Sequence, residues 1–284
     1  MVKIAFVTDS TAYIPADLVN QYNITVTPQI LVWGDQTYRD GVDIQPDEFY
    51  TRLKTSKTMP TTSQVSIITM QHTFQDLITK GYDVLGVFLS GKLSGTMQSA
   101  IQGREALGSA AEKVSIVDSF TTAMAMGFLV LTAARAAEQG SNLEECKKLV
   151  ENGREQTGVY FAVDTLEFLH RGGRIGGATR FIGSALNLKP ILALKDGRVE
   201  AEDRVRTKTK ALDRVLELAS EHLKGKRNIR LATLHANAEQ EARDLLNRAS
   251  MKFNAVESVL SSVSPVVGAH AGPGTVGLAF LAGM

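Results

Sequence analysis

The chain has 284 residues, and its 31 lysines and arginines against 30 aspartates and glutamates give a formal net charge of +1. Hydrophobic residues make up 44% and charged residues 21%, which is close to the globular average and excludes a disordered or fibrous chain. A net charge near zero argues against a nucleic-acid-binding protein, which needs a basic face to displace counterions. The length allows one large domain or two of ordinary size.

The cysteine content and the apolar segments indicate in which compartment of the cell the protein works. The single cysteine, Cys146, cannot form a disulfide framework or a thiolate metal site, and we expect an inert thiol packed in a helix. The longest apolar stretch, 122–137, is short and is interrupted by Gly127 and Arg135, so it predicts no membrane insertion. The N-terminus is typical of a buried strand rather than a signal peptide. We therefore expect a cytoplasmic protein.

The first half of the sequence alternates strand and helix patterns. Strand patterns cover 4–7, 24–32, 83–89 and 114–117, and helical patterns cover 67–80, 96–107 and 121–139. Such alternation predicts a parallel sheet joined by right-handed crossovers. Three of the strands end in small polar residues, at 8–10, 90–91 and 118–119. These positions are the carboxyl ends of the strands, where open α/β sheets bind ligands.

The second half follows a different pattern. Strands are predicted at 159–163, 191–194, 199–205, 229–235, 256–263 and 275–280, and helices at 166–169, 181–187, 207–222 and 239–251. Asp196-Gly197 is a two-residue hairpin signal, and a hairpin inside an α/β pattern predicts a mixed or antiparallel sheet. The change of pattern divides the chain into an N-terminal α/β domain, 1–156, and a C-terminal α/β domain, 157–284.

Several nucleotide and metal motifs are missing from the sequence. It contains neither the phosphate-binding loop Gly-x-x-x-x-Gly-Lys-Ser/Thr nor the metal motif His-Glu-x-x-His. Residues 272–277 match Gly-x-Gly-x-x-Gly, but no βαβ unit follows them and Pro273 removes a backbone donor. We therefore expect no metal site and no nucleotide site.

Two hydroxyl-rich segments precede predicted helices. Residues 59–64 are typical of a turn that leads into a helix, with Ser63 as its N-cap. Residues 90–100 follow a buried strand and open the next helix, so their small side chains and free N–H groups suit a carboxylate or a phosphate. Ordinary helix capping is the alternative for each segment. Ser94 does not lie in a Gly-x-Ser-x-Gly elbow, which disfavours a hydrolase nucleophile.

Two further segments carry candidate functional side chains. Small residues surround His270 within 268–274, so a ligand could reach this side chain. The alternative is that His270 has a purely structural role. The glycine-rich bend 171–177 contains Arg171 and Arg174, whose guanidinium groups suit an anion or a protein partner. The alternative for this bend is a solvated turn.

Together these segments resemble the DegV family, whose characterised members include FakB-type fatty-acid-binding proteins. The resemblance extends over almost the whole chain and rests on 8–10, 62–64, 90–100, 118–119, 165–175, 189–190, Arg206 and 268–274. Met97 departs from the pattern, because the family often has an aromatic residue there. Thr61 precedes the Thr62-Ser63-Gln64 motif, so Thr62 is the aligned hydroxyl.

The resemblance implies a DegV-like fold with an N-terminal parallel sheet, a C-terminal mixed or antiparallel sheet, and one long-chain fatty acid between them. It implies that Thr62 and Ser94 hold the carboxylate and that His270 lies close to it. Lesser candidates at the same site are Thr61, Gly95 and Thr96. The candidates for the wall of an apolar acyl tunnel, with ordinary core packing as the alternative, are Leu166, Phe168, Leu169, Phe181, Ile182 and Leu186.

The resemblance also implies a partner and no cofactor other than the bound fatty acid. FakB-type proteins present the acid to a separate ATP-dependent fatty acid kinase, and the resulting acyl-phosphate feeds phospholipid synthesis. Arg171, Arg174 and Arg206 are the candidates for docking this kinase. Burial of about fourteen methylenes at about 0.8 kcal/mol each supplies roughly 11 kcal/mol of gross transfer energy, so the head group needs no strong ionic clamp.

Two other functions remain open from the sequence. A stand-alone phosphotransferase or hydrolase would use Ser94 or His270 as the nucleophile, with Asp9 or Asp118 to activate it. Such an enzyme would phosphorylate a lipid without a partner. A scaffold protein with a structural lipid would not exchange that lipid for added fatty acid.

Overall fold

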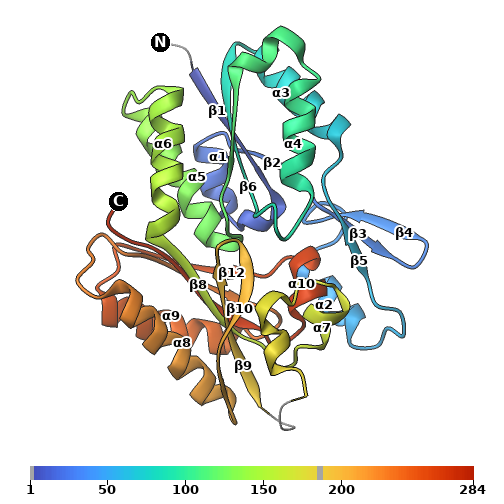
Figure 1. Cartoon of the computed structure of the whole chain (residues 1–284), viewed down its shortest axis with the longest axis vertical. Helices are drawn as coiled ribbons and strands as arrows, with labels where there is room; N and C mark the ends of the chain where they lie inside the picture. The colour runs from blue at the N-terminus through green and yellow to red at the C-terminus, as the bar shows by residue number, and fades with distance from the viewer. Residues whose placement is uncertain (1–2, 184–187) are drawn as a thin grey trace.

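The structure is a computed structural model that describes residues 3–183 and 188–284. Most N-terminal elements form the upper half of Figure 1 and most C-terminal elements the lower half, where the N-terminal helix α2 (Pro46–Leu53) also lies. The α/β fold with a parallel N-terminal sheet and a mixed C-terminal sheet, as predicted, is confirmed. Leu186, one of the predicted tunnel residues, lies outside the described residues.

The N-terminal sheet is parallel and consists of β1 (Lys3–Asp9), β2 (Thr25–Thr27), β6 (Tyr82–Phe88) and β7 (Val114–Asp118) in the order β2-β1-β6-β7. Its helices are α1 (Ala16–Gln21), α3 (Ile67–Thr79), α4 (Thr96–Glu105), α5 (Ala123–Glu138) and α6 (Leu143–Gly153). Val84 and Phe88 of β6 pack with α3 and α4, whereas Leu85 and Val87 join a core with α5. Both faces of the strand are therefore buried, as the continuous apolar pattern predicts.

The single strand predicted at 24–32 is wrong, because this segment forms two strands in different sheets. Pro28, which has no N–H to donate, separates β2 from β3 (Ile30–Trp33). Strand β3 pairs antiparallel with β4 (Gln36–Arg39) and with β5 (Thr61–Ser63), and α2 (Pro46–Leu53) lies between β4 and β5 in the chain.

The turn predicted at 59–64 is also wrong in part, because Thr61–Ser63 form strand β5. The N-cap of α3 is Ser66, whose side chain accepts a hydrogen bond from the Thr69 N–H at 3.0 Å, and not Ser63. This correction matters for the site, since an extended segment turns successive side chains to opposite faces.

The C-terminal sheet is mixed and has the order β10-β9-β8-β13-β11-β12. Its strands are β8 (Thr157–Ala162), β9 (Lys189–Lys195), β10 (Arg198–Val205), β11 (Arg230–His235), β12 (Glu257–Ser262) and β13 (Val276–Leu281). Its helices are α7 (Glu167–Arg171), α8 (Lys208–Leu223), α9 (Glu239–Phe253) and α10 (Pro265–Ala271). The helix predicted at 181–187 is not found in its described part, because a 3₁₀ helix ends at Phe181 and 184–187 lie outside the described residues.

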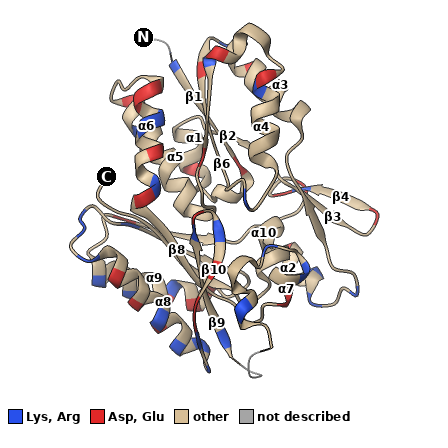
Figure 2. Cartoon of the chain, viewed as in Figure 1, with Lys and Arg blue, Asp and Glu red and all other residues tan. Residues whose placement is uncertain are grey.

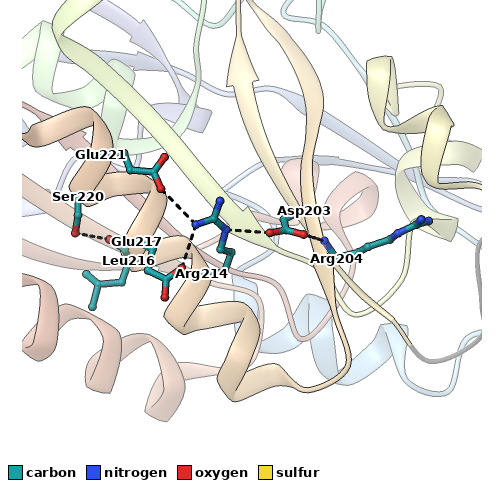
Figure 3. A network of polar contacts seen from close by, with 7 residues as sticks. All are labelled: Asp203, Arg204, Arg214, Leu216, Glu217, Ser220 and Glu221. Atoms are coloured by element: carbon teal, nitrogen blue, oxygen red, sulfur yellow. Dashed lines mark hydrogen bonds and ion pairs between the residues drawn. The ribbon is translucent and has the colours of Figure 1, made fainter.

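Polar contacts attach the covering helix α8 to the edge strand β10. Arg214 of α8 contacts Asp203 of β10 at 2.9 Å and Glu217 of its own helix at 3.0 Å (Figure 3). These ion pairs are partly exposed, so each contributes little to stability. Charged residues of both signs are distributed over the outer helices, including α6, α8 and α9 (Figure 2).

The predicted hairpin at Asp196-Gly197 is confirmed, and its turn contacts the N-terminal half. Both turn residues have positive φ, at 48° and 77°, as a tight hairpin turn requires. The Ser90 hydroxyl donates to the Gly197 carbonyl at 2.8 Å, and the Lys92 ammonium donates to the Asp196 carbonyl at 2.6 Å. The loop after β6 thus holds the C-terminal hairpin in place.

Within the described residues, no helix is both long and apolar enough to cross a membrane. Cys146 is fully buried in α6, and burial raises the pKa of its thiol to about 11. A buried thiol with a raised pKa is unreactive, as the sequence predicts.

We predict that the variant with Ser90→Cys and Gly197→Cys forms a disulfide on oxidation. A Cβ at Gly197 would lie 3.4 Å from the Ser90 Cβ, close to the separation of about 3.5–4.5 Å in disulfides. Non-reducing electrophoresis and intact mass measure the cross-link, and the two single-cysteine variants serve as controls. Free thiols in the oxidised double variant would contradict the docking of the hairpin.

Candidate functional site

A cavity of about 190 Å³ lies between the parallel sheet and the mixed sheet. Most of its wall is apolar and comes from both halves of the chain, including Leu89, Leu93, Val159, Phe161, Leu169, Leu194, Val199, Leu234, Val263, Val266 and Val267. The polar side chains in the wall include Thr62, Ser94, Arg174 and His270. An apolar cavity with a few convergent polar groups is the ordinary form of a small-molecule site.

Thr62 and His270 meet at this wall, although 208 residues separate them in the chain. The Thr62 Oγ1 lies 2.7 Å from the His270 Nε2. Thr62 is half-buried on β5, while its neighbour Thr61 is exposed and does not line the cavity. His270 lies in helix α10 and not in a loop, since Pro265 begins this helix and Gly272, with φ 78°, ends it.

Burial keeps His270 neutral. Its Nδ1 is buried without a hydrogen-bond partner, and a Cβ at Gly172 would lie only 2.0 Å from that atom, so only glycine fits beside the ring. Burial, reinforced by the positive charge of Arg174, lowers the pKa of His270 to about 4. The ring therefore enters the site as a neutral hydrogen-bonding group.

Ser94 stands just before helix α4, next to a buried threonine. Its Oγ lies 3.0 Å from the Thr96 Oγ1 and accepts a hydrogen bond from the Thr96 N–H at 3.2 Å. Thr96 is fully buried behind Ser94, and neither Thr96 nor Gly95 lines the cavity. Of the hydroxyls predicted at the site, Thr62 and Ser94 therefore face the cavity directly.

The three arginines predicted to dock a kinase lie in different settings. Arg174 is part of the cavity wall, where its guanidinium donates to the Leu93 carbonyl at 3.0 Å and to the Gly172 carbonyl at 2.8 Å. Arg171 is exposed and pairs with Glu167 at 2.6 Å. Arg206 is exposed and lines a separate surface groove. The structure thus places Arg174 next to the other polar groups of the cavity.

The residues predicted for the acyl tunnel are also divided. Leu169 lines the cavity. Leu166, Phe181 and Ile182 line the surface groove that contains Arg206. Phe168 packs against Gly272 at the end of α10. The described part of this set therefore does not form one continuous wall.

Residues that the sequence analysis did not select hold α10 against the N-terminal half. The Asp40 carboxylate accepts hydrogen bonds from the Ser10 hydroxyl at 2.6 Å and from the Val266 N–H, in the first turn of α10, at 3.2 Å. The Tyr50 hydroxyl donates to the Val263 carbonyl at 3.1 Å. Burial raises the pKa of Asp40 to about 6. A lone aspartate just after a short strand carries no local motif, so only its tertiary partners identify it.

The arrangement does not resemble a nucleophile activated by a base. The hydroxyl beside His270 belongs to Thr62, and the Nδ1 of His270 has no carboxylate or other group to orient the ring. A histidine with a pKa near 4 is also a weak base at neutral pH. Among the described residues, no group of three or more histidine, cysteine or acidic side chains could hold a metal ion.

We predict that His270 makes folding stability fall as the pH drops below about 6.5. The unfolded chain binds a proton on this residue between pH 6.5 and 4, whereas the folded protein does not, so acid favours unfolding in that range. At pH 5 the difference amounts to roughly 2 kcal/mol. Urea unfolding at pH 7 and pH 5 measures it, and His270→Gln should show a correspondingly smaller loss. Equal losses in both proteins would contradict a buried neutral histidine.

The fold and the cavity define an α/β protein that encloses a small-molecule site between a parallel and a mixed sheet. The model of the DegV family, a family described as uncharacterised, matches residues 3–283. A DegV domain-containing protein of Clostridium perfringens is 35% identical over 276 residues, which cover 96% of this chain and 97% of the relative. The chain belongs to the DegV family, and the resemblance seen in its motifs is confirmed.

Solved structures of related proteins share the complete fold. A DegV family protein from Thermus thermophilus, described as binding fatty acid, matches with a TM-score of 0.93 and 35% identity over 99% of both chains. DegV of Bacillus subtilis, described as a fatty acid binding protein, matches with a TM-score of 0.90 and 34% identity over 99% of this chain and 100% of the other.

Proposed function

We propose that the cavity binds one long-chain fatty acid, with its carboxylate at Thr62 and Ser94 beside neutral His270. The observation that carries this proposal is the convergence of these three side chains on a cavity whose remaining wall is mostly apolar. The relatives from Thermus and Bacillus, which are described as fatty-acid-binding, support it because they share the fold over 99% of this chain.

The acyl chain would run along the apolar wall supplied by β8, β9 and β11. Phe161, Leu194 and Leu234 represent this wall, with Leu169 from the predicted tunnel set. Burial of the chain provides most of the affinity, while the hydroxyls of Thr62 and Ser94 replace the water lost by the carboxylate. The positive charge of Arg174 in the same wall favours the ionised acid.

We further propose that the protein presents the acid to a separate ATP-dependent fatty acid kinase in the cytoplasm, for acyl-phosphate formation and phospholipid synthesis. Arg171 and Arg206 are exposed and remain the proposed docking residues, and Arg174 would contribute from the edge of the cavity. The protein alone, incubated with ATP, magnesium and palmitic acid, should form no acyl-phosphate. Product formation without a partner would instead support the stand-alone phosphotransferase.

We predict that Ser94→Ala and Thr62→Ala each weaken palmitic acid binding by roughly 1–3 kcal/mol, because each removes a hydrogen bond to a buried carboxylate. Isothermal titration calorimetry measures the change. Thr61→Ala is the matched control, since this neighbouring threonine is exposed and does not line the cavity, and it should leave the affinity unchanged. Undiminished binding in both site variants would refute the position of the head group.

A further inference from the structure

Gln64 is a polar residue of the cavity wall that the head-group proposal does not use. It comes two residues after Thr62, just beyond the end of β5, and it lines the same cavity. Among the described residues, none forms a hydrogen bond with the Gln64 amide. Both N–H groups of this amide are therefore available to donate to a ligand.

The amide of Gln64 has a defined place, because it lies against Gly95. A Cβ built on Gly95 would lie 2.6 Å from the Gln64 Oε1, 2.7 Å from its Cδ and 2.9 Å from its Nε2. The missing side chain of Gly95 thus provides the space in which the amide lies. The φ of Gly95 is −72°, which any residue can adopt, so the packing of the amide and not the backbone conformation favours glycine here.

This position brings the amide beside the proposed head group. Thr62 and Ser94 face the cavity from two different segments of the chain, and Gln64 contacts both segments. Its backbone continues from β5, which carries Thr62, and its amide rests on the residue that directly follows Ser94. A carboxylate held between the two hydroxyls would therefore lie next to the Gln64 amide.

A buried carboxylate needs more donors than these two hydroxyls supply. Its oxygens offer about four hydrogen-bonding positions, whereas the hydroxyls of Thr62 and Ser94 can each donate only one proton. An ionised group that leaves water without replacing its hydrogen bonds loses much free energy. The Gln64 Nε2 can supply a further bond. Because Gln64 both lines the cavity and is exposed, its side chain lies where the cavity meets the solvent.

We propose that Gln64 is a third ligand of the fatty-acid carboxylate, which it holds through Nε2 at the opening of the cavity. Gly95 is the residue that makes room for its amide. The proposal rests on the proposed fatty-acid-binding function and adds a binding residue to that same site. It also gives a role to Gly95, which does not itself line the cavity.

The test measures the affinity of the full chain for palmitic acid by isothermal titration calorimetry. Gln64→Ala should weaken binding about threefold to tenfold, because one hydrogen bond to the carboxylate is lost. Gln64→Glu should weaken binding by at least about tenfold, because it places a second negative charge beside the ligand. Gln98→Glu is the matched control. Gln98 is exposed on α4 and does not line the cavity, so this variant should keep the wild-type affinity.

Gly95→Ala tests the same contact from the other side. The three atoms nearest to the new methyl group all belong to the Gln64 amide, at the far end of a flexible side chain, so the fold should remain intact while the amide is displaced. Gly95→Ala should therefore weaken palmitic acid binding about as much as Gln64→Ala does. The double variant should bind no more weakly than either single variant, because both changes remove the same contact. Urea unfolding of each variant checks that the fold is retained.

A second readout reports on the ligand itself. NMR spectroscopy of bound palmitic acid, labelled at its carboxyl carbon, follows the pKa of the acid across a pH series. This pKa should be higher in Gln64→Glu than in the wild type and unchanged in Gln98→Glu. Wild-type affinity in Gln64→Glu, or losses from Gln64→Ala and Gly95→Ala that add in the double variant, would overturn the proposal. A wild-type protein that binds no palmitic acid would instead contradict the proposed function itself.

Discussion

Helix α10 lies at the boundary between the two sheets, and its attachment to the N-terminal half determines where the polar groups of the cavity meet. Asp40 accepts the Val266 N–H at the start of the helix, and Thr62 contacts His270 near its end. The helix itself is only seven residues long, so its own hydrogen bonds cannot hold it in place. The site therefore exists only when the two halves of the chain are packed together.

This packing also decides the charge of the site. Burial of His270 between the halves keeps its ring neutral. The Arg174 guanidinium at the cavity wall donates hydrogen bonds to the backbone carbonyls of Leu93 and Gly172. A carboxylate in this environment meets neutral hydroxyls and a nearby cation without a bidentate arginine clamp. That balance suits a ligand that is held mainly by its apolar chain and must leave again.

The sequence predicted the strands of the parallel sheet and the C-terminal hairpin, because those features depend on local patterns, but it did not predict the three-stranded sheet β4-β3-β5. The roles of the site residues stay predictions. Apolar runs identified β1, β6 and β7, and the pair Asp196-Gly197 identified the hairpin. The break at Pro28 was missed because β-branched residues continue on both sides of it. Residues whose hydrogen-bond partners are distant in the chain had no recognisable motif in the sequence. Asp40 is an example, since its partner Val266 is far away in the chain. Tertiary packing also places Arg174 in the cavity wall and leaves Arg171 and Arg206 exposed, which the sequence did not distinguish.

The most direct test of the account is to identify what the cavity contains after expression in a bacterial host. The purified protein is denatured and extracted with organic solvent, and the extract is analysed by mass spectrometry against a known amount of protein. The account predicts about one long-chain fatty acid per chain, which would exchange with added labelled acid. An extract free of fatty acid, from a folded protein that also takes up none of the added acid, would contradict it.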